Sequence, residues 1–208
     1  MTNLESGQRT SPFLSYCWDD LDMAYMLEAL LAAKGVELIW DKRCLKLDDS
    51  ISQFMSLGCD CSEVILLVSN SYLKSQSCMK EVLEVLEVLN GSEPLQRIRP
   101  LILPSAQIFS PEGRAGYVQY WAGEYEHLQK EIRKIGRGAA AGSLNQDLVL
   151  LNQIYENADH FLSMLADRYS PTELLEFVEH FCAGRQQQGC ISRPSYPLTA
   201  PGGLSLRS

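Results

Sequence analysis

Residues 63–81 read EVILLVSNSYLKSQSCMKE, and this stretch decides the fold. The apolar run VILLV at residues 64–68 is typical of a parallel strand that is buried on both faces. A polar segment follows it, and Glu81 lies four residues into a helical pattern. The stretch therefore predicts a strand followed by a helix, with polar residues near the carboxyl end of the strand, where open α/β sheets bind ligands.

Strand and helix patterns alternate on both sides of this stretch. The expected strands are residues 13–16, 36–40, 64–68 and 98–103, and the expected helices are residues 20–34, 50–61 and a third that ends at residue 89. Asp19 or Asp20 can cap the first helix, Gly35 can end it, and Pro100 indicates an edge strand or a bulge. The alternation predicts an α/β fold with a parallel sheet and helices on both faces.

The region after the fourth expected strand is predicted to be mainly helical. Residues 111–135 indicate a loop followed by an amphipathic helix, and their aromatic cluster from Tyr117 to Tyr125 can cover the sheet. Residues 148–165 predict another helix, and Ser170 and Pro171 have the residue types of a cap and a first helical position, which predicts a last helix that ends by residue 184. These late helices either complete the domain or bind a protein partner.

The remaining segments lack helical or strand periodicity. The glycine-rich residues 136–142 do not follow a strand and lack GxGxxG spacing, which favours a linker over a phosphate loop. The composition after residue 184 is typical of disorder. We therefore expect a loose amino terminus at residues 1–10, an α/β domain at 11–145, a helical extension at 146–184 and a disordered tail at 185–208.

Composition limits the possible partners and location. The net charge of -8 disfavours nucleic acid and anionic membranes, so a protein or small-molecule partner is expected. The seven cysteines lack the spacing of a disulfide framework and no signal peptide opens the chain, which favours a reduced, cytoplasmic protein. The sequence predicts no membrane span and no metal site, because long apolar runs and metal-ligand spacing are both missing.

Five short motifs occur along the chain: FLSY at residues 13–16, LIWD at 38–41, IS at 51–52, LVS at 67–69 and YxxSxxCxxE at 72–81. In their order and spacing, these motifs resemble the TIR domain (Toll/interleukin-1 receptor) family. The resemblance implies a flavodoxin-like parallel sheet of about five strands, with a further strand between residues 105 and 146. Some TIR domains signal by homotypic assembly, and others cleave NAD with one glutamate on the helix after the third strand. Glu81 falls on that position.

The resemblance also implies the remaining site residues. With Glu81 as the catalytic group, the expected NAD-binding residues are Ser15, Tyr16, Cys17, Trp18, Trp40, Asp41, Arg43 and Cys78. Tyr16, Cys17 and Trp18 would line the nicotinamide and ribose side, while Trp40 or Arg43 would stack on a base or meet a phosphate. NAD would be the substrate, no cofactor would be needed, and subunits would form a homo-oligomer through TIR–TIR contacts. Immune signalling or antiphage defence is the expected role.

Simpler interpretations stand beside these roles. Glu81 can be a solvated residue near the amino end of a helix, where negative charge is favoured. Trp40 at a strand end is typical of core, Cys78 of a small buried apolar group, and Asp19 or Asp20 of a helix cap.

Three other functions remain open. A catalytically silent TIR module would act only by assembly. A phosphoacceptor receiver domain would hold magnesium with Asp19 and Asp20, but it needs an aspartate where Ser69 and Asn70 stand. A nucleoside deoxyribosyltransferase would also place a glutamate on a ribose.

Overall fold

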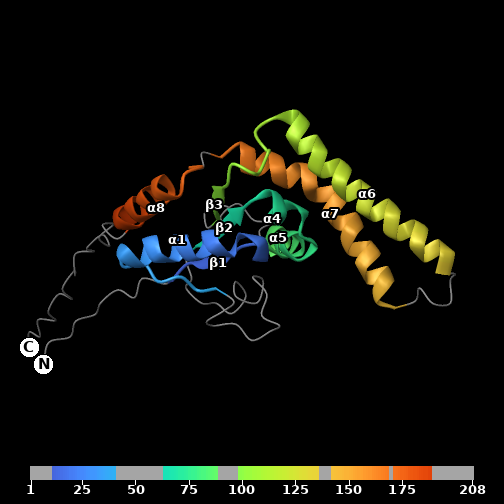
Figure 1. Ribbon diagram of the computed structural model, residues 1–208, viewed down its shortest axis with the longest axis horizontal. Coiled ribbons are helices and arrows are strands. Elements are labelled where there is room, and N and C mark those ends of the chain that lie inside the picture. Colours follow the sequence, from blue (N-terminus) through green and yellow to red (C-terminus); the bar gives the residue numbers. More distant parts are fainter. Residues whose placement is uncertain (1–10, 41–62, 89–97, 136–141, 169–170, 189–208) are drawn as a thin grey trace, which may run out of the picture.

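The computed structural model in Figure 1 describes residues 11–40, 63–88, 98–135, 142–168 and 171–188. Three parallel strands, β1 (Phe13–Ser15), β2 (Val64–Val68) and β3 (Ile98–Ile102), form a sheet in the order β1-β2-β3. All five residues of β2 are buried, as the apolar run predicts. The expected strand at residues 36–40 is reduced to one parallel bridge, between Ile39 and Phe13.

The helices follow the strands and confirm the α/β fold class. They are the 3-10 helix η1 (Trp18–Asp20), α1 (Leu21–Ala33), α4 (Asn70–Lys74), α5 (Gln76–Val88), α6 (Pro111–Ile135), α7 (Ser143–Ala166) and α8 (Leu174–Gln188). Gly35 ends α1 as expected: its φ is 77°, and its N–H donates to the carbonyl of Ala32 at 2.9 Å. A left-handed residue at this position satisfies carbonyls of the last helical turn.

The alternation of side chains along β2 divides the core into two layers. Val64, Leu66 and Val68 pack with α5, α6 and α7, whereas Ile65 and Leu67 pack with α1 and α8. One of the two late helices therefore packs on each face of the sheet, α7 on one and α8 on the other. This packing supports the alternative in which the late helices complete the domain. Figure 1 also shows α6 and α7 side by side as a long pair that extends past the sheet.

α6 differs from its sequence-based prediction. It begins at Pro111, so the loop expected in the first part of residues 111–135 is wrong. Oγ of Ser110 accepts a hydrogen bond from the N–H of Gly113 at 3.0 Å, and a proline at the first helical position needs no such partner. Tyr117 and Trp121 anchor α6 in the core. Of residues 105–146, the described ones (105–135 and 142–146) contain no strand, in contrast to the expected one.

α8 differs from its sequence-based prediction at both ends. It begins at Leu174, after the buried Pro171, and it continues to Gln188, so residues 185–188 are helical where a disordered tail was expected. Arg185 explains the extra length. Its guanidinium lies 3.6 Å from the buried carboxylate of Glu63 and over the ring of Phe181.

Several expectations fall outside the described residues. These are the loose amino terminus, the loop at residues 41–49, the helix at residues 50–61 and the tail beyond residue 188. Within the described ranges, no helix combines the length and apolar character that crossing a membrane requires.

Candidate active site

The carboxylate of Glu81 is directed to the carboxyl end of β1. Oγ of Ser15, the last residue of β1, donates a hydrogen bond to Oε2 of Glu81 at 3.1 Å. Ser15 is buried and Glu81 is half-buried. Glu81 is therefore held at the carboxyl-end edge of the sheet, the edge at which open α/β sheets generally bind ligands, and it is not the solvated helix residue of the simpler interpretation.

A second hydroxyl group completes a hydrogen-bonded chain. The hydroxyl oxygen of Tyr72 lies 3.0 Å from Oγ of Ser15. A serine hydroxyl has only one hydrogen, and that of Ser15 points to Glu81, so Tyr72 must donate to Ser15. Burial raises the pKa of Tyr72 well above its ordinary value, and the nearby Cys78 and Glu81 raise it further. Tyr72 therefore keeps the proton that it donates.

Serine side chains cap the two successive helices that carry Tyr72 and Glu81, α4 and α5. Oγ of Ser69 accepts from the N–H of Tyr72 at 2.9 Å at the start of α4. Oγ of Ser75 accepts from the N–H of Cys78 at 3.4 Å at the start of α5. Such caps satisfy amide groups that have no partner within the helix. The chain therefore changes direction between Tyr72 and Glu81, and both side chains reach Ser15.

The two cysteines near Glu81 are buried thiols. Sγ of Cys78 donates to the carbonyl oxygen of Tyr16 at 3.7 Å, and Cys17 is also buried. Burial is the main cause that raises the pKa of Cys78 to about 12. Because the thiolate is the reactive form, Cys78 is not activated as a nucleophile at neutral pH. Its environment fits a small apolar group that helps to shape the site.

The aromatic residues of the predicted site differ in exposure. The ring of Tyr16 lies 6.2 Å from that of Trp18 and 5.4 Å from that of Trp40, between ring centroids. Trp18 is 66% exposed, whereas Trp40 is 1% exposed and donates from Nε1 to Oε1 of Glu28 at 3.1 Å. The core interpretation of Trp40 thus fits better than a stacking platform. Trp18 has the accessible ring surface.

Asp20 does not act as the expected side-chain cap. It lies at the N-cap position of α1 without a capping hydrogen bond, and its Oδ2 accepts from Oγ of Ser69 instead. Burial raises the pKa of Asp20. The hydrogen bond from Ser69 opposes this shift, and the nearby charge of Asp19 adds to it. In the described part of the chain, no three His, Cys, Asp or Glu residues are grouped to hold a metal ion.

The structure brings together only part of the predicted site. Ser15, Tyr16, Cys17, Trp18 and Cys78 surround the end of β1 near Glu81, whereas Asp41 and Arg43 lie outside the described residues. Sequence reasoning gave no role to Tyr72, which holds Ser15. A signal was present, because Tyr72 begins the YxxSxxCxxE motif, and the hydroxyl of a tyrosine needs a partner when the residue is buried.

The fold and this edge of the sheet define an α/β domain with the Glu81 carboxylate held at the carboxyl end of β1, and comparison with known families agrees on the fold. A sequence profile described as TIR domain matches residues 13–134, more than half of the chain. The protein belongs to the TIR domain family. Among curated proteins, no sequence matches the chain.

Proposed function

We propose that this TIR domain protein cleaves the bond between nicotinamide and ribose in NAD, with Glu81 as the catalytic residue. The observation that carries the proposal is the hydrogen bond of 3.1 Å between Ser15 and Glu81. It fixes a carboxylate at the carboxyl end of β1, the strand that the exposed Trp18 follows in the chain. The family includes proteins that cleave NAD and others that act only by assembly.

The reaction needs little more than a positioned negative charge. The bond between C1′ of the ribose and the pyridinium nitrogen breaks, and its electron pair leaves with nicotinamide, which departs neutral without a general acid. The ribosyl group develops the positive charge of an oxocarbenium ion, as in glycosidases. A fixed carboxylate stabilises that charge, and one preorganised group contributes about 3 to 4 kcal/mol to such a transition state.

The acceptor completes the reaction. Water that adds to C1′ and loses a proton gives linear ADP-ribose, whereas attack by a ring nitrogen of the adenine gives a cyclic product. Contacts between TIR domains would bring in the neighbouring subunits that complete the nucleotide side of the pocket. The same assembly would connect the activity to immune signalling or antiphage defence.

The test is release of nicotinamide from NAD by the full chain, dilute and clustered on a support, followed by chromatography. Glu81→Gln should lower the rate by at least about 100-fold, because the charge is lost while the shape stays. Glu84→Gln is the matched control on the same helix and should keep the wild-type rate. If the clustered wild type releases no nicotinamide, the protein is an assembly module instead. If Glu81→Gln releases nicotinamide as fast as an active wild type, Glu81 is not the catalytic residue and the proposed mechanism is wrong.

A further inference from the structure

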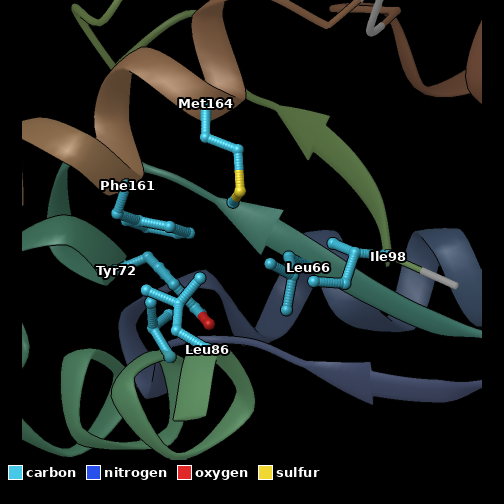
Figure 2. A pocket seen from close by; sticks show the side chains of 7 residues that line it. Leu66, Tyr72, Leu86, Ile98, Phe161 and Met164 are labelled. Atoms are coloured by element: carbon cyan, nitrogen blue, oxygen red, sulfur yellow. The ribbon is translucent and has the colours of Figure 1, made fainter. Parts of the chain in front are cut away.

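Tyr72 connects the hydrogen-bonded chain at Glu81 with the apolar core beneath α7. Its hydroxyl ends the hydrogen-bonded chain that leads through Ser15 to Glu81. Its ring is completely buried and faces α7, whose Phe161 and Met164 lie on the side opposite to the hydroxyl (Figure 2). Tyr72 does not reach solvent, so it cannot touch NAD. Any effect of Tyr72 on a reaction must act through Ser15.

The hydroxyl of Tyr72 determines where the hydroxyl of Ser15 points. A serine hydroxyl can rotate about its Cβ–Oγ bond, and a donor to its oxygen restricts the directions in which its hydrogen can point. Tyr72 supplies that donor at 3.0 Å, and the single hydrogen of Ser15 is then available to Oε2 of Glu81 at 3.1 Å. Without the hydroxyl of Tyr72, the buried Ser15 can turn its hydrogen away from Glu81, and the carboxylate loses the hydrogen bond from Ser15.

The ring of Tyr72 packs against residues of α7, which lie outside the range of the family match. The match ends at residue 134, whereas Phe161 and Met164 belong to α7. The packing there is imperfect: a cavity of about 10 Å³ remains, lined by Leu66, Tyr72, Val82, Leu86, Ile98, Phe161 and Met164. The lining is apolar apart from the hydroxyl of Tyr72, which is directed away from Phe161 and Met164 (Figure 2) and lies 3.0 Å from Oγ of Ser15. Loss of volume on the α7 side would therefore let the ring shift.

We infer that Tyr72 is a positioning residue for Glu81 and that α7 keeps it in place through Phe161 and Met164. The inference rests on the proposed function for its effect on rate. Helix α7 then contributes to the active site without contacting substrate. The rate of NAD cleavage should respond to substitutions in α7 that face Tyr72, while NAD binding should not.

The first test compares two removals of a tyrosine hydroxyl in the full chain. Tyr72→Phe keeps the ring and should lower kcat for nicotinamide release by about tenfold or more, with KM within about twofold, because small misplacements of catalytic groups are costly. Tyr120→Phe is the control, since the hydroxyl of Tyr120 donates to the carbonyl oxygen of Lys74 at 3.4 Å and takes no part in the hydrogen-bonded chain from Tyr72 through Ser15 to Glu81. It should keep the wild-type kcat. Equal kcat values for Tyr72→Phe and wild type would overturn the inference.

The second test compares two shortened phenylalanines on opposite faces of the sheet. Phe161 and Phe181 are both buried, but Phe161 faces Tyr72 and Phe181 lies on α8 in the other core layer. Both leucine variants should melt at lower temperature, and only Phe161→Leu should lower kcat. An equal loss of kcat in Phe181→Leu would show a general effect of destabilisation and would overturn the role of α7.

A third measurement separates this inference from the proposed function. The side-chain carboxyl carbon of Glu81, labelled with ¹³C and assigned with Glu81→Gln, reports its hydrogen bonding without NAD. At pH 7 its resonance should move in Tyr72→Phe and stay in Tyr120→Phe. An unmoved resonance overturns the positioning role even if NAD is cleaved. A moved resonance together with no cleavage by the wild type overturns only the proposed function.

Discussion

Two glycines in one helix should respond in opposite ways to the same substitution. Gly113 and Gly116 both lie near the start of α6. A methyl group on Gly113 would place its carbon 1.8 Å from the carbonyl oxygen of Gln107 and 2.8 Å from the carbonyl carbon. A methyl group on Gly116 meets nothing within 4 Å. The surroundings therefore differ, while the chemical change is identical.

The size of each effect follows from these distances. Real contacts of this kind essentially never fall below 3.0 Å, so the backbone at Gln107 must move by about 1.2 Å, the difference between 3.0 and 1.8 Å. Overpacking of this kind costs about 1 to 3 kcal/mol, and the helix propensity of alanine returns up to about 1 kcal/mol. Gly113→Ala should lower the free energy of unfolding by about 1 to 2 kcal/mol. Gly116→Ala should raise it by about 0.5 to 1 kcal/mol.

Urea denaturation followed by circular dichroism measures both free energies, and thermal melts should differ by about 2 to 4 °C for each kcal/mol. Gly113→Ala should also disturb the start of α4, because the N–H of Gln107 donates to the hydroxyl of Tyr117 at 3.3 Å, and that hydroxyl donates to Oδ1 of Asn70 at 3.2 Å. Equal or greater stability of Gly113→Ala compared with Gly116→Ala would refute the close approach of Gln107 to α6.

Other consequences can be measured on the same purified protein. Glu63→Gln should lower the free energy of unfolding by about 2 kcal/mol in urea denaturation, because Arg99 at 2.8 Å and Arg185 at 3.6 Å both lose the buried carboxylate with which they pair, whereas Glu131→Gln on the exposed face of α6 should change little. Burial raises the pKa of Cys78 from 9.0 to about 12, so the thiol of the unfolded chain loses its proton at lower pH than the thiol of the folded chain. The stability that the protonated Cys78 contributes is therefore present below pH 9 and is lost as the pH rises to about 12. Cys78→Ala should make the fall of melting temperature over this pH range less steep. Trp18 is the exposed one of the three tryptophans, so Trp18→Phe should remove most of the fluorescence that acrylamide quenches.

The sequence predicted the centre of the fold better than its edges. The apolar run of β2 has one interpretation as a strand buried on both faces, and the structure confirms it. The predicted start of α6 was wrong because Gly113 and Gly116 lower the helix propensity of its first turns. Burial of Tyr117 and Trp121 outweighs that local preference, and Nε1 of Trp121 donates to the carbonyl of Leu73 at 3.0 Å. Such long-range contacts are not visible in a local pattern.

The site shows the same division between local and long-range information. Strand ends on one edge of a parallel sheet are neighbours, and this rule brought Ser15 and Glu81 together in the prediction. The link through Tyr72 depends on how α4 is oriented over the sheet, which the pattern of residues does not specify. The burial of Trp40 depends on Glu28 of α1, which receives its indole hydrogen.

The two late helices that close the sheet have a consequence for protein synthesis. A chain leaves the ribosome from its amino end, so β1, β2 and β3 emerge before α7 and α8. Until α8 follows, Leu14, Ile65 and Leu101 lack their cover from Phe177 and Phe181. During that interval the nascent sheet exposes apolar side chains on this face, and a chaperone that binds apolar surface would bind them.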